Sequence, residues 1–338
     1  MIPRFQPATR RSSLTVLAVA AVLVLSGGPS TATAGWVDAK AAIMGTSVRV
    51  RAYHEDDVRA RRAADAALEV LRQVNRTMSP YRADSDLSRI NDQAADHPVA
   101  AAPPVVDVIR RSLDVSRMTH GAFDITFASV GYLYDYRAHK HPDRTTIERK
   151  LPAIDYHHVV VDGDAGTVRF TRPGVRIDLG GIAKGYAVEH AVARMRELGI
   201  RHGQVTAGGD TRLLGDRRGR PWIIGIQDPR DKKAVVARIP AEDEAVSTSG
   251  DYERYFEEDG IRYHHIIDPQ SGDSARTVHS VTIIGPNATF TDAFSTSVFV
   301  LGVNKGLAFI DDQPDYEAVI VDNHGRMHFS RGLARYRD

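Results

Sequence analysis

The stretch from Ile177 to Ala187 places several chemically useful residues within a short distance along the chain. Asp178 ends an apolar run, Gly180 and Gly181 follow, and Lys184 falls at the start of a helical pattern. Adjacent glycines let a backbone approach a ligand closely, and the free N–H groups and dipole of a helix N-terminus attract anions. The stretch therefore suits a phosphate or a metal-bound phosphate. A strand–turn–helix corner whose glycines only permit close packing fits the same residues.

A second group of oxygen-bearing side chains is spaced for one face of a helix. Asp292, Ser295 and Thr296 stand at positions i, i+3 and i+4, and these positions are neighbours on a helix surface. Oxygen ligands suit a hard cation such as Mg²⁺, which takes few protein ligands and completes its shell with water and phosphate. The alternative is structural, with Asp292 capping its helix and the two hydroxyls bonding back to the backbone.

Two neighbouring histidines, His264 and His265, lie in a pattern typical of a strand. Successive side chains of a strand point to opposite faces, so we do not expect the pair to bind one metal. One of them is a candidate proton carrier near neutral pH, although a histidine satisfied within the core is the simpler interpretation. In the polar segment 78–91, Tyr81 and Arg82 can stack on a flat ring and hold an anion. A solvated loop explains that segment as well.

Apolar periodicity and turn residues predict the elements that position these groups. Helices are expected over 57–77, 103–119 and 292–301, and a further helix follows the two glycines and runs to 198. Strand patterns cover 44–53, 159–161, 168–170, 204–209, 222–230, 263–267 and 281–285. Segment 78–91 is polar and turn-rich, and segment 129–152 has the pattern of a long irregular connection with a short helical piece.

Tight turns join many of the expected strands. This favours an α+β fold of mixed, largely antiparallel sheets with packed helices, rather than a doubly wound parallel sheet. The 338 residues are 42% hydrophobic and 26% charged, an ordinary globular composition. We find no fixed-period repeat and no linker, and expect one catalytic unit over 35–338. A net charge of +1 without a basic block gives no reason to expect a nucleic-acid partner.

Residues 1–34 have the order of a secretory signal peptide. Arg4, Arg10 and Arg11 precede an apolar run over 14–25, and small residues follow up to Ala34. The run is shorter than the ~20 residues that span a bilayer, and the paired arginines raise twin-arginine export as one possible route. We expect an exported, periplasmic or extracytoplasmic protein whose mature part has no membrane span. The chain has no cysteine, which excludes disulfides and thiolate chemistry.

Taken in order, these segments resemble the ApbE-like flavin transferases over essentially the whole chain after residue 34. The most specific pieces are Asp-Leu-Gly-Gly-Ile-Ala-Lys-Gly-Tyr-Ala from Asp178 and His-Ile-Ile-Asp-Pro-Gln-Ser-Gly from His265. The resemblance implies a Mg²⁺-dependent FAD:protein FMN transferase. Such an enzyme splits FAD at its diphosphate, moves the FMN phosphate to a threonine or serine hydroxyl of an exported or membrane target flavoprotein, and releases AMP.

The resemblance also implies roles for individual positions. The implied metal ligands are Asp292, Ser295 and Thr296, together with Gly181 through its backbone carbonyl, and His265 matches the histidine tied to catalysis. The implied FAD contacts are Met44, Tyr81, Ala122, Phe123, Asp124, Asp178, Lys184 and Ile267.

Alternatives to the transferase remain open at this point. Water could replace the protein hydroxyl, which would make the chain a Mg²⁺-dependent FAD pyrophosphatase that yields FMN and AMP. A periplasmic FAD-binding protein without turnover is a second possibility. A flavin redox enzyme is less favoured, because no second electron carrier is indicated. The base that takes the hydroxyl proton is His265 or an acid such as Asp268 or Asp178.

Overall fold

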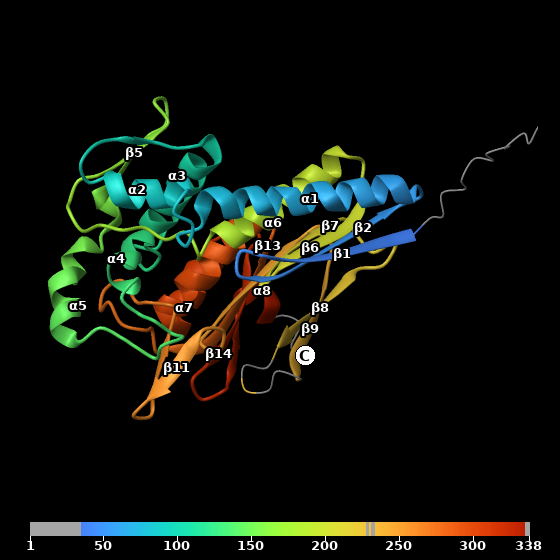
Figure 1. Ribbon diagram of the computed structural model, residues 1–338. Coiled ribbons are helices and arrows are strands. Elements are labelled where there is room, and N and C mark those ends of the chain that lie inside the picture. Colours follow the sequence, from blue (N-terminus) through green and yellow to red (C-terminus); the bar gives the residue numbers. More distant parts are fainter. Residues whose placement is uncertain (1–34, 228–229, 231–233, 335–338) are drawn as a thin grey trace, which may run out of the picture. The chain divides into compact units, whose positions relative to one another are not determined.

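An eight-stranded sheet is the centre of the computed structural model, which describes residues 35–227, 230 and 234–334 (Figure 1). Its strand order is β1-β2-β6-β7-β10-β13-β14-β15, and every neighbouring pair is antiparallel. The strands are β1 Gly35–Ile43, β2 Thr46–His54, β6 His202–Ala207, β7 Asp210–Leu214, β10 Ala245–Gly250, β13 Val278–Gly285, β14 Glu317–Asp322 and β15 Met327–Phe329. The predicted α+β fold is confirmed.

Three long helices pack on this sheet and on one another: α1 Asp57–Met78, α6 Ala183–Glu197 and α7 Ala288–Asp311 (Figure 1). Helix α1 begins at Asp56, whose carboxylate accepts the Val58 and Arg59 N–H groups, a normal N-cap. Its buried face is rich in alanine, so α1 and α6 can approach closely. Helix α6 ends before Gly199, as predicted, and this glycine has a φ of +85°.

A smaller layer is built from the segments between α1 and α6. It contains α2 Asp86–Gln93, α3 Pro103–Met118 and a three-stranded sheet, β3 Val99–Ala100, β5 Thr167–Phe170 and β4 Val159–Asp162. The short helices α4 Ala128–Gly131 and α5 Arg144–Lys150 and three 3₁₀ turns, Ile125–Phe127, Leu151–Ala153 and Tyr156–His158, complete this region.

The prediction of a loop throughout 78–91 is wrong in its second half. Ser85 caps α2 by accepting the Ser88 N–H, and Leu87 and Ile90 are fully buried. Two apolar residues in a polar helix of 8 residues are too weak a periodic signal. Their burial is decided by the layer on which they pack.

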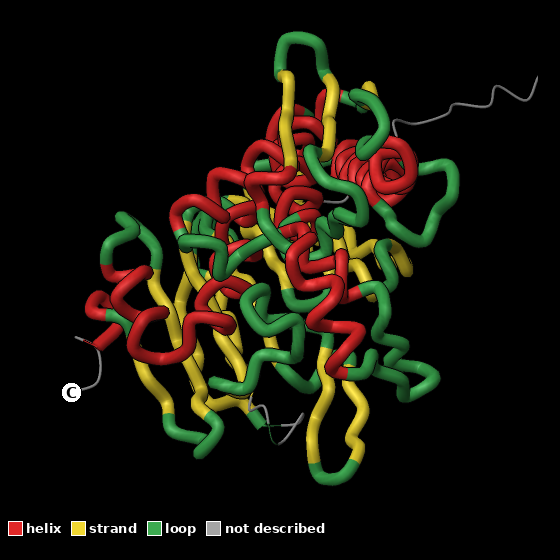
Figure 2. The backbone as a smooth tube through the Cα atoms, turned by 90° about the vertical axis from the view of Figure 1, so that its left-hand side faces the viewer, coloured by secondary structure: helices red, strands yellow, loops and turns green. Residues whose placement is uncertain are grey.

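Two hairpins lie outside the large sheet. One pairs β8 Trp222–Gln227 with β9 Val235–Ala241, and Asp228 and Pro229 of the predicted 222–230 strand lie outside the described residues. The other pairs β11 Tyr255–Glu258 with β12 Ile261–His264 and projects at the lower end of Figure 2. Strands β1, β3, β7, β9, β10, β14 and β15 were not predicted.

Helix α7 is longer than expected. It starts at Ala288 rather than Asp292, and Gly302 interrupts it with φ 73° and ψ −175°, at the predicted stop. By length and composition this helix could cross a membrane, contrary to the expectation that no later run qualifies. Half of its most apolar window is buried inside the protein, and a core helix passes the same test.

The predicted signal peptide, residues 1–34, lies outside the described residues. That peptide stays a prediction.

Candidate functional site

The centre of the site is the point where α6 crosses α7. A Cβ built on Gly185 would lie 2.6 Å from Asp292 Cβ and 2.9 Å from the Ala288 carbonyl carbon. These distances are shorter than real contacts allow, so only glycine permits this approach. The close crossing brings Lys184 of one helix beside Asp292 of the other. The glycine pattern of the sequence therefore serves packing and the site at once.

A lysine between two carboxylates occupies the crossing. The Lys184 ammonium donates to Asp210 Oδ2 at 2.7 Å and to Asp292 Oδ1 at 3.4 Å, while the Gly185 N–H donates to Asp292 Oδ2 at 2.9 Å. Burial and the nearby Asp210 charge raise the pKa of Asp292 to about 7, and the Lys184 charge offsets part of this shift. The two carboxylates hold the pKa of Lys184 above its usual value despite burial. An added cation would therefore stabilise the ionised carboxylates of Asp210 and Asp292.

Hydroxyl groups line the same side of α7. Ser249 of β10 lies 2.8 Å from Ser295 Oγ and 3.3 Å from Thr296 Oγ1, and Thr296 Oγ1 is 3.3 Å from a Cβ built on Gly181. The predicted ligands Gly181, Asp292, Ser295 and Thr296 are therefore brought together. Asp292 does not cap α7, because Asn287 does so. Ser295 does bond back to the Asp292 carbonyl, as the structural alternative expects.

This donor set fits Mg²⁺. All its members offer oxygen, the ligand that Mg²⁺ prefers, and only one is a carboxylate, which leaves room for water and phosphate. Among the residues described, no group of three His, Cys, Asp or Glu side chains is placed to hold a metal. A site for a softer metal such as Zn²⁺ would need nitrogen or sulfur ligands.

Asp178 stabilises the loop before α6 through its side chain and its backbone. Asp178 Oδ1 accepts the Gly180 N–H at 2.6 Å, and its backbone N–H donates to Ile125 O at 3.0 Å. Burial raises the pKa of Asp178, and the Arg254 guanidinium partly lowers it. Asp178 thus has one carboxylate oxygen left for a ligand and a cation as its neighbour.

The two neighbouring histidines lie in different surroundings. His264 is buried, and its Nε2 lies 2.6 Å from the Ala275 carbonyl, so it is a satisfied core residue. His265 is half-buried, and its Nδ1 has no hydrogen-bond partner of good geometry among the described atoms. Burial, then the positive charges of Arg254, His264 and Lys184, lower the pKa of His265 to about 3. The ring is neutral at physiological pH and can accept a proton.

The segment 122–124 lies against the glycine loop. Phe123 is buried, with its ring 3.2 Å from a Cβ built on Gly181, and Ala122 is buried beside it. Asp124 Oδ1 accepts from the Thr126 N–H and hydroxyl, and Oδ2 accepts from the Tyr156 N–H. Burial raises the pKa of Asp124, and these donors oppose the shift. Its carboxylate is therefore already committed to the fold.

The remaining predicted FAD contacts surround this centre more loosely. Met44 forms the β1–β2 turn with a φ of 56°, Ile267 is buried against Gly131, and Tyr81 is 86% exposed. Tyr81 is free to stack on a ligand, since it packs on no described ring.

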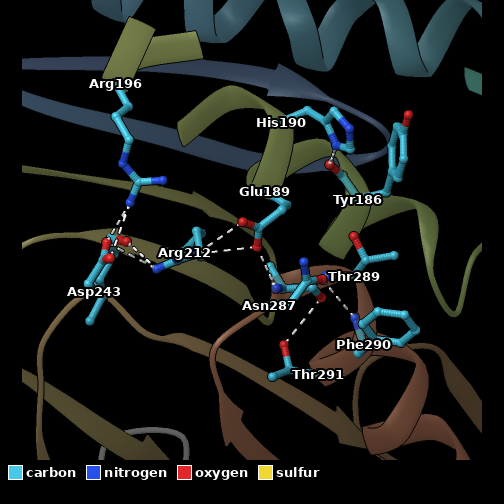
Figure 3. Close-up of polar contacts among 12 residues, drawn as sticks. Tyr186, Glu189, His190, Arg196, Arg212, Asp243, Asn287, Thr289, Phe290 and Thr291 are labelled. Atoms are coloured by element: carbon cyan, nitrogen blue, oxygen red, sulfur yellow. Dashed lines mark hydrogen bonds and ion pairs between the residues drawn. The ribbon is translucent and has the colours of Figure 1, made fainter. Parts of the chain in front are cut away.

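Behind the crossing, a second set of charges fixes the start of α7 (Figure 3). Glu189 of α6 accepts the Ala288 N–H at 2.6 Å and the Arg212 Nε–H at 3.2 Å. Arg212 also approaches Asp243 at 3.5 Å, and Asp243 accepts from Arg196 at 2.8 Å (Figure 3). This chain of contacts holds α6, the start of α7, β7 and the turn before β10 in one arrangement.

Comparison with known proteins agrees with this geometry. A sequence model described as the ApbE family matches residues 44–320. The chain belongs to the ApbE family. The resemblance drawn from the sequence is thereby confirmed.

Relatives of this ApbE-family chain are named FAD:protein FMN transferase. The one from Vibrio cholerae is 32% identical over 301 residues, 87% of this chain and 89% of the relative. The one from Treponema pallidum is 33% identical over 317 residues, 86% of each. A solved ApbE protein from Thermotoga maritima superposes with a TM-score of 0.83 at 34% identity, covering 90% of this chain and all of the other. The solved flavin transferase ApbE from Vibrio cholerae gives 0.79 at 28% identity, covering 89% and 99%.

Three residues of the site were missed in the sequence. Asp210 follows the glycines Gly208 and Gly209, so an acid beside a glycine turn was an available signal. Ser249 and Arg254 carry no local signal, because their positions depend on how β10 and the β11–β12 hairpin meet α7 and the glycine loop.

Proposed function

We propose that this chain is a Mg²⁺-dependent FAD:protein FMN transferase that acts on a threonine or serine of an exported or membrane flavoprotein and releases AMP. The observation that carries the proposal is the α6–α7 crossing, where Asp292, Lys184 and the hydroxyls of α7 meet. The names of the relatives supply the reaction class. The metal, the acceptor hydroxyl and the leaving group are this proposal's own additions.

The residues divide into two tasks. Asp292, Ser295, Thr296 and the Gly181 carbonyl would hold Mg²⁺, whose chemistry is to neutralise the diphosphate and polarise the phosphorus under attack. Lys184 meets the phosphate oxygens, and Met44, Tyr81 and the 122–124 segment hold the rest of FAD. Phosphoryl transfer needs mainly such positioning and charge stabilisation.

The proton of the acceptor hydroxyl passes to His265. The hydroxyl oxygen forms a bond to the FMN phosphorus, the bond from that phosphorus to the bridging oxygen breaks, and AMP leaves with the electron pair. Asp268 is a poorer base, because its carboxylate already accepts from the Gln270 N–H and the Ser271 hydroxyl. A bound diphosphate would raise the pKa of the imidazole from its low value, since negative charge favours the protonated ring.

The test uses purified protein, FAD, Mg²⁺ and a flavin-carrying exported acceptor domain, with the acceptor read by intact mass. We expect one added FMN unit and one AMP per labelled acceptor, with no labelling after chelation of the metal. An acceptor with its target threonine changed to valine is the matched control and should stay unlabelled.

Two other results would contradict the proposal. FMN and AMP formed at the same rate with and without acceptor would favour the pyrophosphatase, in which water takes the place of the hydroxyl. FAD that stays intact but bound would favour a carrier protein.

Export is also a proposal, because it rests on residues 1–34 alone. The mass of the protein recovered outside the cytoplasm would show whether the chain begins after Ala34. A protein recovered only inside the cytoplasm with Met1 retained would contradict export.

A further inference from the structure

Arg254 lies beside three parts of the site that are distant in the sequence. Its guanidinium Nη2 is 3.5 Å from a Cβ built on Gly45, in the β1–β2 turn. Its carbonyl accepts the His265 N–H at 3.2 Å. Its charge also acts on the ionisation of Asp178 and His265. The guanidinium therefore lies at the β1–β2 turn, the Arg254 backbone is bonded to the proposed base, and the Arg254 charge acts on the glycine loop.

No ion pair or side-chain hydrogen bond involves Arg254 in the part of the chain that the structure describes. Two other arginines of this region, in contrast, form ion pairs with carboxylates. Arg262 approaches Asp251 at 3.1 Å and Glu257 at 2.9 Å, and Arg276 approaches Asp273 at 3.0 Å. Arg254 is exposed and keeps all five of its donors available.

When no substrate is bound, the positive charge of Arg254 opposes the protonation of His265. A cation near His265 makes that ring harder to protonate, which hinders the acceptance of a proton. An anion bound between Arg254 and His265 would offset this unfavourable effect of the guanidinium on the protonation of His265. The planar fork of an arginine matches two phosphate oxygens at once, and a diphosphate is the anion that the proposed reaction brings.

We propose that Arg254 is a further substrate-contacting residue whose guanidinium binds the diphosphate of FAD beside His265. This inference rests on the proposed function and adds a second cation to the site, opposite Lys184. The diphosphate would then lie between a half-buried lysine on the α6–α7 side and an exposed arginine on the hairpin side. Negative charge that develops as the bond to AMP breaks is stabilised from both sides.

The test compares Arg254→Ala and Arg254→Lys with the wild type, using the full-length protein and FAD binding followed by flavin fluorescence. Charge-assisted hydrogen bonds of this kind are worth about 10-fold to 100-fold in affinity. We expect Arg254→Ala to weaken FAD binding by that amount and Arg254→Lys by less. Arg61→Ala, an exposed cation of α1, is the matched control and should bind FAD as the wild type does.

Ionic strength provides a readout that a structural role would not move. Salt weakens the attraction between exposed charges, so the wild type should lose FAD affinity as salt rises, and Arg254→Ala should lose less. Unchanged FAD affinity in Arg254→Ala, with a raised KM for the acceptor protein, would overturn the proposal and assign the guanidinium to the acceptor. An equal salt dependence in the two proteins would overturn it as well.

The binding measurement separates this inference from the proposed function. If the wild type binds FAD but labels no acceptor, the transferase proposal fails while the Arg254 contact is still decided by affinity. If the wild type labels the acceptor and Arg254→Ala binds FAD normally, only the Arg254 contact fails.

Discussion

The two sides of the site are built by different means. On the α6–α7 side, Lys184 and Asp292 sit where helices touch through Gly185, and Glu189 fixes the start of α7 from behind. On the hairpin side, Arg254 and His265 flank two short strands that lie outside the large sheet. The first side is held by backbone contact and the second by side-chain stacking.

Aromatic rings hold the hairpin to its neighbours. Tyr263 stacks on His141 at 4.2 Å with a 9° angle between the ring planes, and on Phe256 at 5.2 Å. The His139 ring also stacks on Phe256, with the ring centroids 5.4 Å apart. His141 Nε2 lies 2.9 Å from a carboxylate oxygen of Glu258. Such contacts contribute about 0.5–1.5 kcal/mol each beyond their buried area. The hairpin can therefore shift at lower cost than the helix crossing.

The difference assigns separate duties to the two sides. Under the proposed function, a metal and a diphosphate would need fixed ligands, which the crossing would provide. An acceptor protein must enter and leave, and a weakly held hairpin allows this. Changes at the crossing should abolish function or stability, whereas changes at the hairpin should reduce turnover while the fold persists.

The largest effect is expected from Asp292→Asn. The amide can still accept the Gly185 N–H, but the carboxylate charge for Mg²⁺ is gone, so flavin transfer should fall at least about 100-fold, the scale of lost metal-site contacts. The measurement is the initial rate of acceptor labelling at saturating FAD. Ser297→Ala removes a hydroxyl of the same helix that donates to Ala293 O and should keep most of the activity. Equal rates in Asp292→Asn and wild type would remove Asp292 from the site.

Gly185→Ala tests the crossing itself. The added methyl would overlap the α7 backbone, and relief of such an overlap costs about 3 kcal/mol. We expect Tm to fall by about 5 °C, with loss of transfer as α7 moves away from Lys184. Gly163→Ala is the matched control, since a Cβ there meets nothing within 4 Å. If the Gly185→Ala protein were as stable and active as the control, α6 and α7 would be able to move apart without loss of function.

Tyr263→Ala tests the hairpin. Removal of the ring that stacks on His141 and Phe256 should leave Tm nearly unchanged and lower the transfer rate about 10-fold, because Arg254 and His265 are then less well positioned. Limited proteolysis should cut the 255–264 hairpin faster than in the wild type. A large loss of Tm instead would mean that the hairpin is part of the global core.

The smallest effect concerns pH. His265 has a pKa lowered to about 3 in the folded protein, whereas an unfolded histidine titrates near 6.5. The unfolded chain thus binds more protons between these values, so the free energy of unfolding decreases as pH falls below about 6.5. His265→Gln should lose about 2 kcal/mol less than the wild type between pH 7 and pH 5. Urea unfolding at the two pH values measures this, and parallel losses would contradict a neutral, buried ring.

Much of the fold was predictable because its signals are local. The helices over 57–78 and 103–118, the Asp162–Gly166 hairpin turn and the stop at Gly199 follow from periodicity and glycine placement. The helix at 86–93 and the strands β1 and β14 were missed, since short or uniformly apolar segments take their structure from what covers them. His264 and His265 do lie in different surroundings, but strand alternation is not the reason, because β12 ends at His264 and His265 lies in the bend that follows.

The sequence by itself determined the family, the fold class and the residue types of the site. Specific strings such as Asp178–Ala187 retain that information without any coordinates. Only the tertiary structure decided that Asp210 joins Lys184, that Ser249 faces Ser295 and that Asp124 is committed to the fold. Arg254 was likewise placed beside His265 by the way the hairpin returns toward the glycine loop. The physical reason is that helix crossings and hairpin docking depend on contacts between residues far apart in the chain, which no local pattern encodes.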